Sequence, residues 1–143
     1  MRVNEVLKSK QIQEIVTISP SATVGELVAL MAKHNVGAVV VSADGSSLDG
    51  IVSERDVVRR MTEASDVLVG RVDSIMTSDV RTCGQDDQTN ELMQLMTELR
   101  IRHIPVLHDG ELCGVISIGD VVKSRMSELE FERDQLETYV HTT

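Results

Sequence analysis

The chain has 143 residues and a formal net charge of −9, which argues against binding to nucleic-acid phosphates or to anionic membrane surfaces. An aromatic content of 1% leaves no platform on which single-stranded bases could stack. Hydrophobic residues form 41% of the sequence, enough for a packed core in one domain or in two small halves that share a core.

Targeting and metal-binding signals are not found in the sequence. The opening MRVNEVLKSKQIQ is too charged for a secretory signal peptide, and no apolar run approaches the roughly 18 residues that a spanning helix needs. Cys83 and Cys113 stand far apart, without the spacing of a metal or redox site. These features predict a soluble cytoplasmic protein with free thiols.

The first half of the chain predicts a strand, a helix, two further strands and a second helix. Apolar residues at positions 24, 27, 28 and 31 give the helix one buried stripe. Asp44 and Gly45 form a pair suited to a hairpin turn between the two later strands. The elements are, in chain order, a strand at 14–18, a helix at 23–34, strands at 37–43 and 48–53, a helix beginning near Glu54, and a linker at 65–73.

The second half repeats the first. ELVALMAKHNVGAVVV at 26–41 aligns without a gap with ELMQLMTELRIRHIPV at 91–106, and GIVSERDVV at 50–58 aligns with GVISIGDVV at 114–122. Upstream, VNEVLK at 3–8 resembles VDSIMT at 72–77. Two copies of such a long repeat suit homologous halves packed face to face rather than a solenoid. The repeat predicts apolar helical positions 92, 95, 96 and 99, strands at 103–108 and 112–117 around Asp109 and Gly110, and a helix from about Ile118.

Each nine-residue run contains Ser-x-x-Asp where a strand gives way to a helix, as Ser53 with Asp56 and as Ser117 with Asp120. One interpretation is a helix cap, in which the Ser and the carboxylate satisfy free backbone N–H groups. The other is a nucleotide site, in which the carboxylate holds a ribose diol and the helix start attracts phosphate. Basic residues near the motifs favour the second interpretation; they are Arg55, Arg59, Arg102, His103 and Lys123.

TISPSATVGELVALM, GIVSERDVV, RHIPVL and GVISIGDVV, in this order, resemble a tandem pair of CBS domains, also called a Bateman module. The resemblance covers residues 3 to 126, and its SERD and SIGD motifs with a helical tail look like the small stand-alone bacterial members. It implies an α/β fold of two β-α-β-β-α repeats packed with pseudo-twofold symmetry. The implied boundaries are CBS domains at 8–64 and 72–128 and a C-terminal helical tail at 129–143.

The resemblance also implies two ligand clefts. In the family, the Asp of the Ser/Thr-x-x-Asp motif holds ribose and its Ser or Thr helps to hold phosphate. Val39 and Ile104 would offer backbone groups and apolar contact to a base, or equally be plain core. Matching residue by residue gives Thr17, Ser53 and Asp56 for one cleft and Thr82, Ser117 and Asp120 for the other, with Ala38, Val39, Arg55, Arg102, His103, Ile104, Pro105 and Gly119 around them.

No convincing nucleophile, metal set or phosphate loop is found, so the sequence does not predict an enzyme or a catalytic cofactor. The leading interpretation is a sensor of adenine nucleotides (AMP, ADP, ATP or NAD(H)), whose ligand shifts the population between arrangements of the halves. Its output would go to a protein partner or to another copy of the chain. The alternative is a regulatory interaction module whose clefts have lost their ligand.

Two further expectations concern assembly and the clefts. CBS pairs commonly associate as dimers, so the resemblance implies a homodimer. The second unit offers Arg102 and His103 where the first has Gly37 and Ala38, so we expect the Asp120 cleft to bind a monophosphate more tightly. In the tail, a coiled-coil step of four and three, interrupted by a charge, joins Val122, Met126, Leu129, Arg133, Leu136 and Val140; the alternative is a helix lying on its own module.

Overall fold

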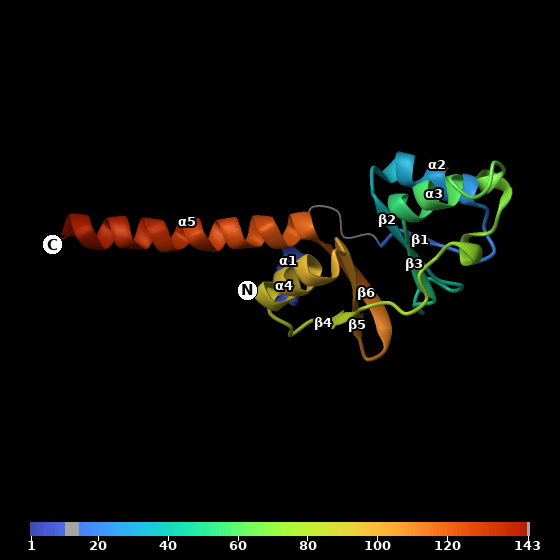
Figure 1. Cartoon of the computed structure of the whole chain (residues 1–143). Helices are drawn as coiled ribbons and strands as arrows, with labels where there is room; N and C mark the ends of the chain where they lie inside the picture. The colour runs from blue at the N-terminus through green and yellow to red at the C-terminus, as the bar shows by residue number, and fades with distance from the viewer. Residues whose placement is uncertain (11–14, 143) are drawn as a thin grey trace.

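Two small α/β units lie next to each other, and one long helix projects from the second (Figure 1). The computed structural model describes residues 1–10 and 15–142. The helices are α1 (Val3–Ser9), α2 (Val24–His34), α3 (Glu54–Met61), α4 (Thr89–Leu99) and α5 (Ile118–Thr142), with 3-10 helices η1 (Val67–Val69) and η2 (Val72–Ser74). The strands are β1 (Thr17–Ile18), β2 (Ala38–Val41), β3 (Gly50–Ser53), β4 (Cys83–Gly84), β5 (His103–His108) and β6 (Glu111–Ser117).

The two sheets repeat one topology, as the α/β fold class predicted. Each has three strands, in the order β1-β2-β3 and β4-β5-β6. The first pair of strands in each sheet is parallel and the second pair is antiparallel. The predicted strands at 103–108 and 112–117 are confirmed almost to the residue, whereas β1 is shorter than predicted, and position 14 lies outside the described residues.

The two central helices follow from their sequences. In α2 the Thr23 side chain caps the first turn by accepting a hydrogen bond from the Glu26 N–H at 3.1 Å. Val24, Leu27 and Met31 are buried as predicted. The fourth position of the stripe is not buried, because Val28 is 39% exposed. The repeated stripe in α4 buries Leu92 and Met96, while Leu99 at its end is exposed.

The two Asp-Gly pairs form different turns. Asp109 and Gly110 both have positive φ, 52° and 79°, and they make a tight two-residue hairpin between β5 and β6. Asp44 instead starts a longer loop between β2 and β3, in which its carboxylate accepts hydrogen bonds from the N–H groups of Ser46 and Ser47. These hydrogen bonds lower the pKa of the Asp44 carboxyl below its usual range. The predicted hairpin at this place is present, since β2 and β3 pair antiparallel, but its loop is longer than the turn at Asp109.

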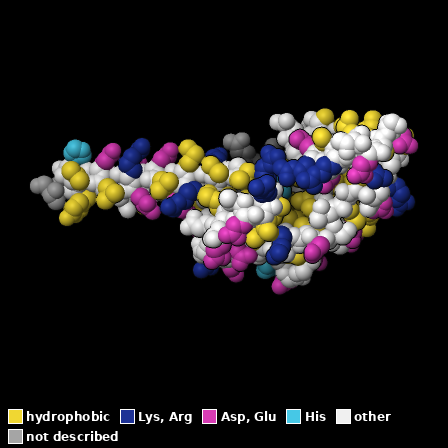
Figure 2. All heavy atoms as spheres, viewed as in Figure 1, with side chains coloured by type: hydrophobic (Ala, Val, Ile, Leu, Met, Phe, Trp, Pro, Cys, Tyr) yellow, Lys and Arg dark blue, Asp and Glu magenta, His cyan; other side chains and the backbone are white. Residues whose placement is uncertain are grey.

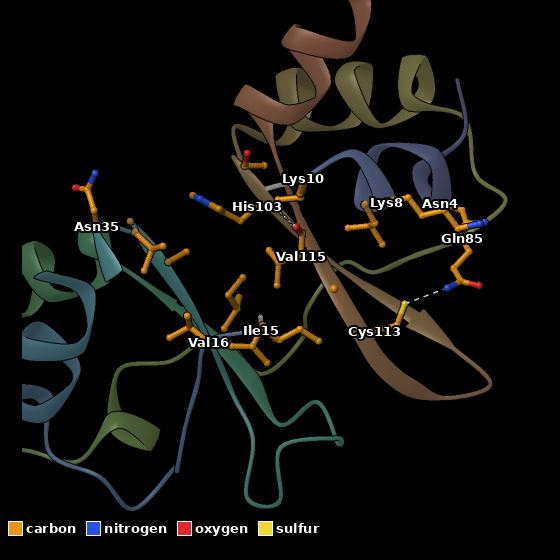
Figure 3. A pocket seen from close by; sticks show the side chains of 18 residues that line it. Asn4, Lys8, Lys10, Ile15, Val16, Asn35, Gln85, His103, Cys113 and Val115 are labelled. Carbon is orange, nitrogen blue, oxygen red and sulfur yellow. Dashed lines mark hydrogen bonds between the residues drawn. The ribbon is translucent and has the colours of Figure 1, made fainter. Parts of the chain in front are cut away.

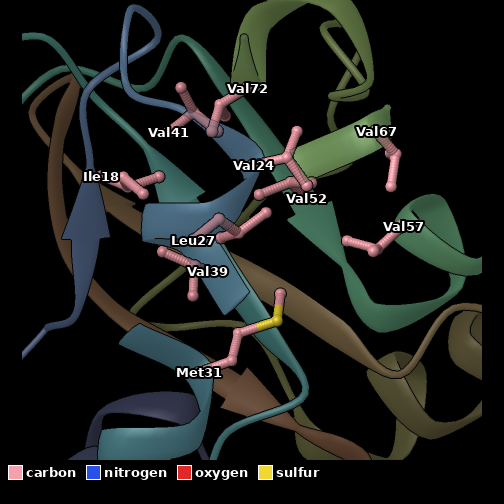
Figure 4. Close-up of a cluster of buried hydrophobic side chains, with 10 residues drawn as sticks. All are labelled: Ile18, Val24, Leu27, Met31, Val39, Val41, Val52, Val57, Val67 and Val72. Carbon is pink, nitrogen blue, oxygen red and sulfur yellow. The ribbon is translucent and has the colours of Figure 1, made fainter. Parts of the chain in front are cut away.

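The segment before each sheet packs on the opposite unit. Val3 and Val6 of α1 belong to the core of the second unit, whereas Val72, at the start of the second repeat, is buried in the core of the first (Figure 4). A glycine of each repeated motif lies against the incoming segment. A Cβ on Gly114 would lie 2.9 Å from Leu7, and a Cβ on Gly50 would lie 2.8 Å from the Met76 sulfur. The core of each unit therefore includes side chains from the segment that leads into the sheet of the other unit.

The last helix runs unbroken from Ile118 to Thr142, so the expected tail continues the final helix of the second unit. Val121 and Ser124 of its first half are buried against the body. The amino group of Met1 forms an ion pair with Glu128 at 2.8 Å. The far half of α5 projects away from both units (Figure 1). Of the helices at residues 1–10 and 15–142, none is both long and apolar enough to cross a membrane.

Candidate functional site

The two Ser-x-x-Asp motifs form the same reciprocal cap. The Ser53 N–H donates to Asp56 Oδ2 at 2.8 Å, and the Asp56 N–H donates to Ser53 Oγ at 3.4 Å. The corresponding distances for Ser117 and Asp120 are 2.9 and 3.1 Å. The capping interpretation is therefore confirmed in both units. Each cap also holds a carboxylate at the start of a helix, beside the cleft between the units.

One cavity in this cleft, of about 280 Å³, contains the Asp56 motif, and we call it the Asp56 cavity. It draws on both units, because the segment 77–81 and the end of α4 face α3 across it. Apolar contact comes from Ala38, Ile51 and Val80. Its charged lining comprises the arginines Arg55, Arg59, Arg81, Arg100 and Arg102 and the carboxylates Glu54, Asp56 and Asp79.

The excess of cations in the Asp56 cavity contrasts with the rest of an acidic chain. Five arginines face three carboxylates there, whereas the whole chain carries −9. Lys and Arg side chains gather on the visible face where the two units meet (Figure 2). A guanidinium offers a planar pair of donors that match phosphate oxygens. The arrangement places a ribose-type carboxylate beside groups that can hold phosphate.

A second cavity of about 430 Å³ borders the first, with which it shares Gly37, Ala38, Ile51 and His103, and we call it the Lys10 cavity. It is lined by α1, the start of the first sheet and β6, and it contains Ser117 (Figure 3). The Lys10 Nζ donates to Asp120 Oδ2 at 3.0 Å and to the Val115 carbonyl oxygen at 3.0 Å. The carboxylate of the second motif is thus already paired with a cation.

The electrostatics of the Lys10 cavity follow from this pair. Burial alone would raise the pKa of the Asp120 carboxyl, but hydrogen bonds from Ser117 and Lys10 outweigh it and hold the pKa below its ordinary value. Asp120 is therefore ionised at neutral pH. His103 lines both cavities, and burial together with the neighbouring Arg102 lowers its pKa. A neutral imidazole can both donate and accept a hydrogen bond toward either cavity.

The structure groups the predicted residues differently from the repeat. Arg102 lies with Asp56 rather than with Asp120, and Ala38 and His103 line both cavities. Ser53 and Arg55 line the Asp56 cavity, as the matching implied. The backbone of Arg102 lies at the second motif, where its carbonyl oxygen accepts a hydrogen bond from the Ile118 N–H at 2.9 Å, but of the two cavities Arg102 lines only the Asp56 cavity.

Other predicted residues lie outside the linings. Val39 and Ile104 are 1% and 0% exposed and belong to the cores, which was the second of the two roles predicted for them. Pro105, next to Ile104, is also buried. Thr17 pairs with Val40 in the first sheet, and Thr82 directly precedes β4. Among the described residues that line the two cavities, neither threonine is found, and Asp120 is connected to the Lys10 cavity through its hydrogen bond with Lys10. Gly119 is in the first turn of α5, in a shallow hollow with Val122.

Sequence reasoning missed four basic residues that line the cavities, namely Lys8, Lys10, Arg81 and Arg100. Lys10 and Arg81 belong to segments that pass from one unit to the other. These two residues reach the cavities only because their segments pass between the units, and no local sequence pattern predicts that path. The repeat offers no help either, because extending the alignment of residues 3–8 with 72–77 places Asp79, an acidic residue, at the position of Lys10.

The two cysteines lie on the strands that flank β5. Burial, with a smaller effect of Asp87, raises the pKa of the Cys83 thiol to about 12. Cys113 is less buried and lines the Lys10 cavity, and both thiols are free. Within the part of the chain that the structure describes, no cluster of His, Cys, Asp or Glu could hold a metal ion.

Comparison with known proteins identifies the repeat. The sequence pattern of the CBS domain matches residues 4–63 and 72–127. The chain is 40% identical over 123 residues to the CBS domain-containing protein CBSX3, mitochondrial, of Arabidopsis thaliana. That match covers 82% of this chain but only 60% of the relative, so the chain spans less than two thirds of the relative's length.

Solved structures show the same architecture. The CBS-domain containing protein ATU1752 from Agrobacterium tumefaciens superimposes with a TM-score of 0.82 at 37% identity, covering 87% of this chain and 99% of that one. The CBS domain pair of protein MJ0100, solved in complex with 5′-methylthioadenosine and S-adenosyl-L-methionine, has a TM-score of 0.77 at 20% identity. It covers 90% of this chain and 98% of that one, and at this identity the likeness concerns the fold.

Proposed function

We propose that this chain, which belongs to the CBS domain family, is a regulatory module that binds a phosphorylated adenine nucleotide between its two units and catalyses no reaction. The observation that carries the proposal is the Asp56 cavity, where a carboxylate suited to a ribose diol lies beside five arginines. The adenosyl ligands bound to the distantly related MJ0100 pair support an adenosine-type ligand. The arginines favour phosphate over the sulfonium of S-adenosylmethionine.

Size and charge narrow the choice of nucleotide. A cavity of about 280 Å³ lies at the lower end of the volumes of small-molecule sites, which favours AMP over ATP or NAD(H). The same charge distribution ranks the two clefts. Five arginines surround Asp56, whereas Asp120 is already paired with Lys10. The Asp56 cleft is therefore the tighter site for a monophosphate in this proposal, the reverse of the order that the sequence predicted.

Regulation follows from where the ligand would sit. Arg55 and Asp56 belong to the first unit, and Arg100 and Arg102 belong to the second. A nucleotide that contacts both sets favours the arrangement of the units that brings them together, and it shifts the population toward that arrangement. The output then reaches a protein partner or a second copy of the chain.

Isothermal titration calorimetry with AMP tests the proposal. Asp56→Ala should weaken the tighter binding phase ten- to a hundredfold, because a hydrogen bond to a charged group contributes about 1.5–3 kcal/mol. Asp66→Ala, which removes an exposed carboxylate in the linker, is the matched control and should leave the affinity unchanged. Arg102→Ala should weaken AMP more than adenosine.

The outcome that would contradict the proposal is specific. No binding heat with AMP, ADP, ATP or NAD(H), together with no nucleotide in the protein after native purification, would favour the ligand-free interaction module. A tight phase that survives Asp56→Ala and disappears with Asp120→Ala would restore the order of clefts that the sequence predicted.

A further inference from the structure

The second half of α5 carries apolar side chains that its own chain does not cover. The CBS pattern ends at residue 127, while the helix continues to Thr142. The part of α5 beyond residue 127 is only about four turns long, and an isolated helix of that length is marginally stable in water. An uncovered apolar stripe on it therefore points to a partner. The stripe, with the exposed fraction of each side chain, comprises Val122 (42%), Met126 (56%), Leu129 (47%), Leu136 (66%) and Val140 (66%).

The stripe faces away from the body. Val121, Ser124 and Glu128 hold the helix against its own chain, the first two by burial and the third through the Met1 amino group. At about 100° per residue, the stripe lies on the order of 130° around the helix axis from these three positions. The alternative that the tail lies on its own module is therefore wrong for this face, as the projecting helix makes visible (Figure 1).

We propose that this stripe pairs with the same stripe of a second copy, in antiparallel orientation and centred near Phe131. The spacing is self-complementary about that residue. When two copies run in opposite directions, Met126 lies opposite Leu136 of the second copy, and Val122 lies opposite Val140 of the second copy. Leu129 then lies opposite Arg133 of the second copy, so each of the five apolar residues of the stripe has a position opposite it. This complementarity, together with the charges beside the stripe, identifies a second copy of the chain as the partner that covers it.

Arg133 decides the orientation. In a parallel pair, Arg133 would face Arg133 of the second copy in the same layer, and Glu132 would approach Glu137 of that copy, so like charges would meet. In the antiparallel pair, Arg133 lies opposite Leu129 of the second copy and between its Glu130 and Glu132. Glu130 also faces Glu130 of the second copy, and Glu132 faces Glu132 of that copy, but the two arginines lie among these four carboxylates and offset their repulsion. Lys123 lies near Glu137 of the second copy.

The oligomeric state tests the stripe. Light scattering after size exclusion at tens of micromolar, without nucleotide, should give a dimer. Leu136→Ser should weaken that dimer at least a hundredfold, because a buried leucine is lost at two symmetric places. Phe131→Ser is the matched control, since Phe131 is 63% exposed on the opposite face of the same helix, and it should remain dimeric. A monomeric wild-type chain, or a dimer that survives Leu136→Ser, would overturn the proposal.

Cross-linking tests the orientation independently of nucleotide binding. In a background with Cys83→Ser and Cys113→Ser, chains with Met126→Cys should form disulfides with chains carrying Leu136→Cys when the two are mixed. Neither chain alone should do so in an antiparallel pair. Rapid cross-linking of Met126→Cys chains to each other would show a parallel pair and refute the antiparallel arrangement. Failure of the AMP experiment would leave this result unchanged.

Discussion

Replacing Lys10 by Met should raise the affinity of the Asp120 cleft for adenosine about tenfold, on the proposal that ribose binds to the carboxylate of each motif. The Lys10 ammonium donates to Asp120 Oδ2 and so competes with a ribose hydroxyl for this carboxylate. A nucleoside without phosphate gives the displaced ammonium no new partner. Lys10 therefore acts as a competitor for this ligand.

The magnitude follows from the two hydrogen bonds that a ribose would have to displace. Both are 3.0 Å long, one to Asp120 Oδ2 and one to the Val115 carbonyl oxygen. A hydrogen bond to a charged group contributes about 1.5–3 kcal/mol. The Lys10 and Asp120 side chains are 31% and 20% exposed, so water recovers part of the loss. A net cost of about 1.4 kcal/mol, or roughly tenfold in affinity, remains. Met keeps the apolar stem and removes the charge.

The assay is calorimetry with adenosine in an Asp56→Ala background, so that only the Asp120 cleft contributes. Lys123→Met is the control, because it removes an exposed ammonium one turn after Asp120 on α5. The gain should be smaller with AMP, whose phosphate gives Lys10 a new partner. An adenosine affinity that is unchanged or reduced by Lys10→Met would refute the reasoning.

Two other predictions concern packing and reactivity. Gly114→Ala should lower the free energy of unfolding in urea by about 1–3 kcal/mol, because the new Cβ would lie 2.9 Å from Leu7. Adding Leu7→Ala should recover part of this loss. Gly50→Ala should cost more, since its Cβ would lie 2.8 Å from a backbone carbonyl oxygen, which cannot move aside as a side chain can. An equal cost for the two alanines would contradict the close-approach argument. At pH 8, iodoacetamide should modify Cys113 faster than Cys83 until urea exposes both thiols. Burial raises the pKa of both thiols, but Cys83 is the more deeply buried and its pKa rises to about 12; equal rates in the native protein would contradict that burial.

The repeat predicted the fold well because its signals are local. The apolar stripe of α2, the cap at Ser53 and the hairpin at Asp109 each depend on residues a few positions apart, and all three are present. The cavities depend on contacts between distant segments. VNEVLK and VDSIMT have matching apolar positions, so the sequence cannot say which core each one covers.

The same limit explains why the alignment did not place Arg102 beside Asp56. Alignment puts Arg102 and Asp120 in one repeat, and contact within a repeat is the natural first assumption. In the structure the end of α4 faces α3 of the other unit, so Arg102 shares a cavity with Asp56. Lys10 was missed for a related reason, because its partner Asp120 is 110 positions away in the chain.

The crossing of the two leading segments has a consequence for how the chain folds during synthesis. The core of the first unit needs Val72, and the core of the second needs Val3 and Val6, which the ribosome makes first. The first unit can therefore close early, once residues just past its own end have emerged. The second must wait for β6 and then recruit α1 across more than a hundred residues of chain, a loop closure that is entropically costly and slow. Until the elements of the second unit are made, Val3 and Val6 of α1 lack the core that covers them.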